Sequence, residues 1–221
     1  MADIFELFKK IETKKDSPDS APTHIIAGLG NPGREYERTR HNAGFLALDY
    51  LGDKLGVSCT RAKFNALCAD ARLGTHRVLL MKPQTFMNAS GEAIRQAADF
   101  YKIPPENILI LVDDIYQDTG RMRVRKDGSH GGHNGLKNIE ANLGTAAYPR
   151  IRLGVGQKPS PQYDLVSWVL GVLPKEEIAN LVSCFPLIDK AAEMIFAGDF
   201  EGAMGLCNGH RPPVKKSESE S

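Results

Sequence analysis

The feature that most constrains the fold of this chain is a regular alternation of short apolar runs with helical patterns. The apolar runs have the length and the residue types of buried strands, and turn-forming residues separate them. They are His24–Leu29, Ala66–Leu73, Arg77–Met81, Ile108–Val112, Arg121–Arg125 and Ile151–Val155. Because helices that follow strands in this way cover the faces of a sheet, the alternation predicts an α/β fold.

The helical patterns lie between these runs. Apolar residues recur with helical periodicity over Ala43–Leu55 and over Ala89–Tyr101. A third pattern covers Lys175–Phe196, and Pro186 should kink or split it because proline removes a hydrogen bond of the helix. We therefore predict a single α/β domain with a central twisted mixed β-sheet, flanked by helices in a three-layer sandwich.

Length and composition fit one globular domain. The chain has 221 residues, enough to bury one sizeable core. We expect the folded domain to cover residues 23–210, with a flexible N-terminal extension that holds a short amphipathic stretch (residues 1–22) and a disordered tail (residues 211–221). The first residues lack the apolar segment of a secretory signal, and no apolar run is long enough to cross a membrane. A cytoplasmic location is therefore expected by default. The four cysteines form no CxxC pair, so we expect reduced and mostly structural thiols.

Charge is unevenly distributed along the chain. The net charge is only +1, which gives no global sign of nucleic-acid binding. Between Thr119 and Lys158, however, eight lysines and arginines stand against two acids. Such an excess of positive charge can attract a phosphate backbone, although a solvated strand face would explain it equally well.

A glycine-rich turn, IIAGLGNPG, follows the first predicted strand. Gly28, Gly30 and Gly33 match the GxGxxG spacing of dinucleotide-binding folds. Pro32 interrupts the loop, however, and the segment REYERTRHN stands where the helix should begin. No acid follows at the end of a second strand, so the pattern disfavours a dinucleotide site.

Two polar segments contain candidates for acid–base chemistry. His41, in TRHNAG, directly precedes a predicted helix. An imidazole there can serve as a general base near neutral pH, although an ordinary surface or capping histidine fits as well. Asp113 and Asp114 stand at the carboxyl end of an apolar strand, where open α/β sheets form their binding clefts. One of these carboxylates would suffice to orient a catalytic imidazole.

Two further motifs offer polar side chains. In KPQTFMNASG, Asn88 could cap a helix or could offer an amide N–H to an anionic transition state. In DGSHGGHNGLKNI, the glycines allow close approach of a ligand, and a helix is predicted from Leu136. His130 and His133 have a spacing that suggests zinc. Because glycines surround them and no third ligand is close, we expect no metal site.

Together these motifs resemble one enzyme family. GLGNPGxxYxxTRHNAG, KPxTFMNxSG, the DD strand end and GSHGGHNGLKNI occur in the order and at the approximate spacing of the peptidyl-tRNA hydrolases, from about His24 to Ile195. The resemblance implies hydrolysis of the ester between a peptide and the 3′ end of tRNA, by a monomer without a cofactor. It implies peptidyl-tRNA as the partner, with no membrane and no obligate protein partner.

The resemblance also implies roles for individual residues. His41 falls on the family's catalytic histidine, a general base that activates water, and Asp113 on its supporting acid. Implied substrate-binding residues are Asn31, Tyr36, Met87, Asn88, His133 and Asn134, and implied tRNA-binding residues are Arg123, Arg125 and Arg152. Tyr116 and Ala89 depart from the family's usual residues, and we expect effects on fine binding at most.

Two other functions are compatible with parts of the sequence. One is a non-catalytic RNA-binding relative, because some members of this fold family serve in RNA processing. The presence of His41 and Asp113 together with the three asparagines favours the enzyme. The other is an NAD-linked oxidoreductase, which would rest on the three glycines alone.

Overall fold

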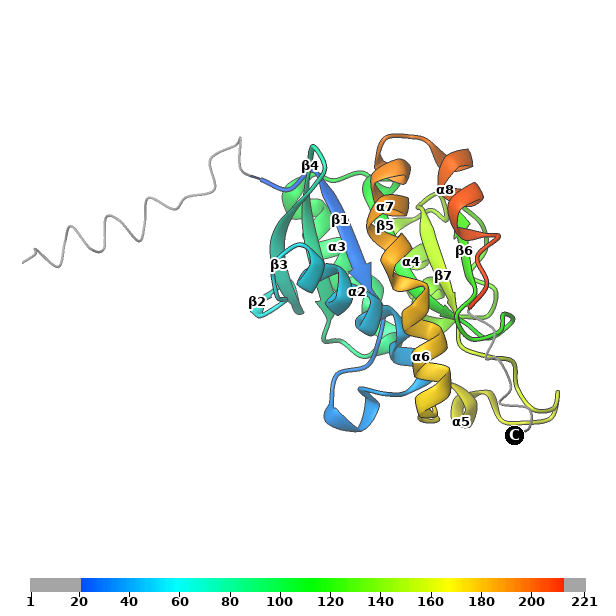
Figure 1. Cartoon of the computed structure of the whole chain (residues 1–221). Coiled ribbons are helices and arrows are strands. Elements are labelled where there is room, and N and C mark those ends of the chain that lie inside the picture. Colours follow the sequence, from blue (N-terminus) through cyan, green and yellow to red (C-terminus); the bar gives the residue numbers. More distant parts are fainter. Residues whose placement is uncertain (1–20, 213–221) are drawn as a thin grey trace, which may run out of the picture.

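The computed structural model describes residues 21–212, which form a β-sheet between two layers of helices (Figure 1). The extension predicted over residues 1–22, its amphipathic stretch and the predicted tail lie almost wholly outside the described residues. The proposed domain boundaries therefore stay predictions. Within residues 21–212, no helix combines the length and apolarity that a membrane span requires.

The sheet has seven strands in the order β2-β3-β4-β1-β5-β7-β6. Strands β4, β1, β5 and β7 are parallel, whereas β2, β3 and β6 run antiparallel to their neighbours. The bounds are β1 His24–Gly28, β2 Arg61–Lys63, β3 Ala66–Leu73, β4 His76–Pro83, β5 Ile108–Asp114, β6 Met122–Arg125 and β7 Arg150–Gly154. The predicted mixed sheet is confirmed. The prediction missed β2, whose three residues contain no apolar run.

Helices cover both faces of the sheet, as predicted (Figure 1). Helices α2 (Ala43–Lys54), α7 (Ile188–Phe196) and α8 (Phe200–Cys207) cover one face and share its apolar core. Helices α3 (Ser90–Tyr101) and α4 (Asn134–Leu143) cover the other face, over a second core. The two buried cores make the domain a three-layer sandwich.

The region around Pro186 is split, as its sequence predicts. Helix α6 (Lys175–Ser183) ends before it, the short 3-10 helix η5 (Phe185–Leu187) contains it, and α7 begins after it. The sequence did not predict α8 or the short α5 (Leu165–Val169). Helix α4 begins at Asn134 rather than Leu136, because the side chain of His133 caps it.

One glycine on each element, Gly28 of β1 and Gly44 of α2, permits a close contact between β1 and α2. A Cβ atom on Gly28 would collide with the carbonyl oxygen of Gly44, and one on Gly44 with that of Leu111 on β5. Helix α2 does not begin at the glycine turn, since an irregular segment of two 3-10 helices, η1 (Arg34–Tyr36) and η2 (Arg40–Asn42), precedes it. Gly28 thus has a packing role, and the helix that a dinucleotide site needs does not begin at the turn, so the structure disfavours a dinucleotide site.

Candidate active site

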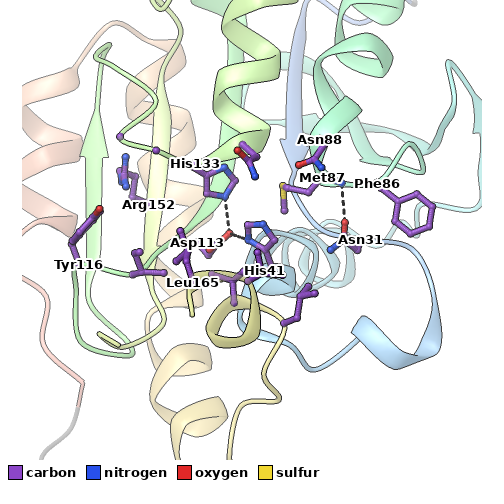
Figure 2. Close-up of a pocket in the computed structure, with 17 residues that line it drawn as sticks. Asn31, His41, Phe86, Met87, Asn88, Asp113, Tyr116, His133, Arg152 and Leu165 are labelled. Carbon is purple, nitrogen blue, oxygen red and sulfur yellow. Dashed lines mark hydrogen bonds and ion pairs between the residues drawn. The ribbon is translucent and has the colours of Figure 1, made fainter. Parts of the chain in front are cut away.

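Three side chains from three different elements meet at the carboxyl ends of the parallel strands. Asp113 stands near the end of β5, His41 lies on η2, and His133 directly precedes α4. His41 Nδ1 and His133 Nε2 each lie 2.9 Å from the same carboxylate oxygen, Asp113 Oδ1 (Figure 2). Asp113 is buried, so both contacts are shielded from water.

The position of the ring protons follows from the hydrogen bonds. As the cap of α4, His133 accepts the backbone N–H of Leu136 at Nδ1, over 3.3 Å. Its proton must therefore be on Nε2, which donates to Asp113. Neutral His41 donates to the same oxygen through Nδ1–H, so in this form its Nε2 carries no proton. Because His41 also lines a pocket, this imidazole can accept a proton there.

The environment shifts the pKa of both members of the His41–Asp113 pair. Burial lowers the pKa of His41, but the charge and hydrogen bond of Asp113 outweigh this effect and raise it above 6.5. For Asp113, burial favours the neutral acid, but the two imidazoles outweigh it and hold its pKa far below the usual range. Asp113 is consequently an anion at neutral pH, as a group that stabilises an imidazolium must be.

The same three residues could in principle bind a metal ion, since their ligand atoms lie within 4.8 Å of one another. A metal on His133 Nε2 would move the ring proton to Nδ1, where it would face the N–H of Leu136. The cap of α4 thus favours a hydrogen-bonded cluster over a metal site.

A pocket of about 400 Å³ opens in front of His41 and is lined on one side by amide side chains (Figure 2). Asn31 Oδ1 accepts the backbone N–H of Met87 over 2.8 Å, so the Asn31 Nδ2 group is left for the pocket. Asn42 fixes this loop by two hydrogen bonds to the backbone of Asn31, over 2.8 and 2.9 Å. Asn88 and Asn134 also line the pocket.

The helix-capping interpretation of Asn88 is wrong. Residue Ala89 holds the N-cap position of α3, which has no side-chain cap, and Asn88 lies within the 3-10 helix η3 (Met87–Ala89). Among the described residues, the Asn88 side chain has no hydrogen-bond partner. Its amide is therefore available to a ligand in the pocket that it lines.

Phe86 lines the pocket in a strained conformation. Its φ of 55° and ψ of 166° fall in a region that only glycine adopts readily, and its side chain is 55% exposed. The sequence did not single it out. Tyr36, which the resemblance places in the binding set, does not line the pocket, and its ring reaches the site only through an edge contact with Phe86 at 6.4 Å.

The basic residues fall into two groups. Arg123 and Arg125 are exposed on the edge strand β6, and Arg123 pairs in register with Arg152 of β7. Arg152 lines the pocket, and its Nε donates to Asp114 Oδ2 over 2.9 Å. In contrast, Arg150 is 1% exposed and binds the carbonyl oxygens of Gly128 and Ala146. The basic surface is therefore smaller than the sequence suggests.

The opposite wall of the pocket is apolar, and the sequence analysis missed it. It consists of Ile115, Tyr116, Leu165, Val166, Val169 and Leu170. Helix α5 contributes half of this wall, and two of its residues, Leu165 and Val166, are exposed large hydrophobics. The available signal was the apolar run LVSWVLGVL, which follows a polar loop. Periodicity could not identify the helix, because a short helix contains too few turns.

These features define an α/β enzyme of the hydrolase class, with an imidazole, a supporting carboxylate and amide donors around one open pocket. Comparison with known proteins identifies the family. The family model described as Peptidyl-tRNA hydrolase matches residues 25–217. The chain therefore belongs to the peptidyl-tRNA hydrolase family, and the resemblance seen in the sequence is confirmed.

Individual relatives agree with this assignment. The chain is 46% identical over 187 residues to the peptidyl-tRNA hydrolase of Clostridium novyi, which covers 85% of this chain and 98% of that protein. It is also 46% identical to the one of a Thermoanaerobacter species, over 84% of this chain and 100% of that protein. The crystal structure of the Acinetobacter baumannii peptidyl-tRNA hydrolase is similar at a TM-score of 0.80 and 34% identity, over 86% of this chain and 96% of that one.

Proposed function

We propose that this chain hydrolyses the ester that joins a peptide, or an N-blocked amino acid, to the 3′ end of tRNA. The observation that carries the proposal is the geometry of His41, whose Nδ1 is held by Asp113 over 2.9 Å while Nε2 is left for the pocket. An ester of this kind is activated enough for attack by water, so the site needs a base and no covalent nucleophile.

In the proposed reaction, His41 Nε2 takes a proton from water as its oxygen attacks the ester carbonyl. Asp113 stabilises the imidazolium that forms, because its carboxylate stays ionised. The Nδ2 groups of Asn31 and Asn88 donate to the developing oxyanion. When the intermediate collapses, the imidazolium returns the proton to the ribose oxygen, so free tRNA and a peptide carboxylic acid leave the site.

The two histidines of the cluster have different roles in this account. Because His133 Nε2 is already bound to Asp113, this side chain fixes the carboxylate and offers the substrate only its ring face. Asn134, the first residue of α4, is exposed beside it and is assigned to the water or to the tRNA end. Met87 is buried, lines the pocket and holds the Asn31 side chain through its backbone N–H.

The tRNA-binding surface is proposed to run from the pocket to the edge of the sheet. Arg152 lies at the pocket beside Gly131 and Gly132, and Arg123 and Arg125 continue the positive charge onto β6. An exposed guanidinium recognises phosphate through two parallel hydrogen bonds. Phosphate contacts of this kind position an RNA without reading its sequence, which suits an enzyme that acts on many tRNAs.

We further propose that the chain acts as a monomer in the cytoplasm. All four cysteines are unpaired, and three of them are buried, as is usual in a reducing compartment. Light scattering during size-exclusion chromatography tests the oligomeric state: the monomer mass supports the proposal, and twice that mass contradicts it.

The test of the activity is release of free tRNA from N-blocked aminoacyl-tRNA by the purified chain. His41→Ala, prepared identically, shows whether hydrolysis comes from this protein rather than from a contaminant. Hydrolysis by the intact chain and its loss in the variant support the proposed function. A folded chain that binds the tRNA but releases nothing would support the RNA-binding alternative instead.

A further inference from the structure

Arg40, next to His41 in the chain, has a buried side chain whose guanidinium group is fully engaged in contacts. It is 5% exposed. Its Nε donates to the carbonyl oxygen of Val155 over 3.2 Å, and Nη1 lies 3.4 Å from those of Gly171 and Val172. Nη2 forms an ion pair with Glu177 of α6 over 2.9 Å. All three guanidinium nitrogens are thus bound, and none faces the pocket.

These contacts close a loop onto the active site. Val155 directly follows β7, and Gly171 and Val172 come just after Leu170, the C-cap of α5, so one guanidinium holds both ends of the segment 156–170. In addition, the backbone N–H of Arg40 donates to the carbonyl oxygen of Gly171 over 3.1 Å. The segment in between carries α5, the helix that contributes Leu165, Val166 and Val169 to the apolar wall of the pocket.

An aromatic contact completes the connection. The guanidinium carbon of Arg40 lies 3.7 Å from the centre of the Trp168 ring, on α5. The indole N–H of Trp168 donates to the carbonyl oxygen of Gly156 over 3.2 Å, which turns the ring toward Arg40. A stacked cation and ring that are largely shielded from water attract each other more strongly than an exposed pair.

We propose that Arg40 is a positioning residue that docks α5 through Trp168 and thereby sets the apolar wall against the part of the substrate beside the scissile ester. The identity of the substrate in this inference rests on the proposed function, whereas the docking of α5 by Arg40 does not. It assigns Arg40 to substrate binding rather than to proton transfer. Loss of the docking should therefore raise KM and leave kcat nearly unchanged, since His41 and Asp113 keep their own contacts.

Trp168 is the only tryptophan of the chain, so its fluorescence reports on α5 alone. In Arg40→Lys, the charge stays but one ammonium cannot replace the planar fork and its stacking. We expect acrylamide to quench Trp168 more strongly than in the intact chain. The matched control is Arg61→Lys on the edge strand β2, the same change in an exposed ion pair with Asp70. Quenching of Trp168 in this variant should equal that in the intact chain.

Kinetics with N-blocked aminoacyl-tRNA test the consequence for binding. Arg40→Lys and Trp168→Ala should each raise KM about five- to tenfold, with kcat within about twofold of the intact chain. The double variant should be no worse than the poorer single variant, because both remove one contact. Trp168→Phe keeps an aromatic face for the guanidinium and should restore most of the affinity.

Three results would overturn the proposal: equal quenching of Trp168 in Arg40→Lys and the intact chain, additive losses in the double variant, or a fall in kcat at unchanged KM. The last would place the effect of Arg40 on His41 instead. If the intact chain hydrolyses no substrate, the proposed function fails, while the quenching experiment still decides whether Arg40 docks α5.

Discussion

Asp113→Asn removes the charge of the cluster with the smallest change of shape. The asparagine Oδ1 can still accept both imidazole N–H groups, but its NH₂ group then replaces Asp113 Oδ2, which is buried without a partner among the described residues. A buried unpaired donor costs about 1–3 kcal/mol of folding free energy. We therefore expect a folded variant with a lower midpoint of urea unfolding.

The effect on catalysis comes from the lost charge. Two unit charges about 4 Å apart attract by roughly 4 kcal/mol at an effective dielectric constant near 20. The imidazolium of His41 forms at hydrogen-bond distance from Asp113, 2.9 Å between Nδ1 and Oδ1. Before the reaction, Asp113 already stabilises neutral His41 through their hydrogen bond, so only part of this attraction is specific to the transition state. We therefore expect the plateau of kcat/KM to fall by about 10²–10³-fold in Asp113→Asn.

The assay is the pH profile of kcat/KM with N-blocked aminoacyl-tRNA. His41 must be neutral to act as a base, so activity rises with pH as the ring loses its proton. Because Asp113 raises the pKa of His41, the half-maximum of the intact chain should lie above pH 6.5. In Asp113→Asn the burial that lowers the pKa of His41 is no longer opposed by a carboxylate. The pH of half-maximal kcat/KM should therefore lie below that of the intact chain.

A matched control is Asp114→Asn, which changes the neighbouring carboxylate and its pair with Arg152 but not His41. It should raise KM and leave the pH of half-maximal activity in place. The electrostatic role of Asp113 would be contradicted if Asp113→Asn kept both the plateau of kcat/KM and the pH of half-maximal activity of the intact chain. It would also be contradicted if Asp114→Asn moved this pH as far as Asp113→Asn does.

Further predictions concern the amide wall, the basic strand and the fold. Asn88→Ala should lower kcat about 10²-fold without changing the midpoint of urea unfolding. Asn31→Ala should lower both kcat and the midpoint, because of these two side chains only Asn31 also binds the Met87 backbone. Equal midpoints in the two variants would contradict this. Replacing Arg123 and Arg125 together by Gln should raise KM and flatten its dependence on salt, as titration with NaCl would show. Gly91→Ala should destabilise the fold by about 1–3 kcal/mol in urea unfolding, since its Cβ would lie 2.5 Å from the Asn138 carbonyl oxygen; a neutral effect would mean that α3 and α4 can move apart.

The strands and long helices were predictable because their patterns are local. Ile108–Val112 is a continuous apolar run, and its place in the centre of a parallel sheet follows from that. The edge strand β2 has only the sequence RAK, and pairing with β3 rather than apolar content makes it a strand. Helix α5 is too short for periodicity to identify, and it depends on tertiary contacts such as Arg40 on Trp168.

The site was predictable in its parts rather than in its connections. His41 and Asp113 stood out because of their motifs, but nothing local shows that His133 shares the same carboxylate oxygen. Arg150 and Arg152 look alike in the sequence, two residues apart on one strand. Only the fold shows that Arg150 is enclosed by carbonyl oxygens while Arg152 reaches the pocket. Asn42 was hidden in the same way, since its bonds to Asn31 cross a loop.

In the proposed mechanism, the His41 imidazole is the base. The most direct test is hydrolysis of N-blocked aminoacyl-tRNA by His41→Ala with and without added imidazole, next to a measurement of tRNA affinity. If His41 is the base, tRNA affinity should be unchanged, hydrolysis should fall by orders of magnitude, and imidazole should restore part of it, more so as the added base loses its proton. Full hydrolysis by His41→Ala without imidazole would contradict this mechanism.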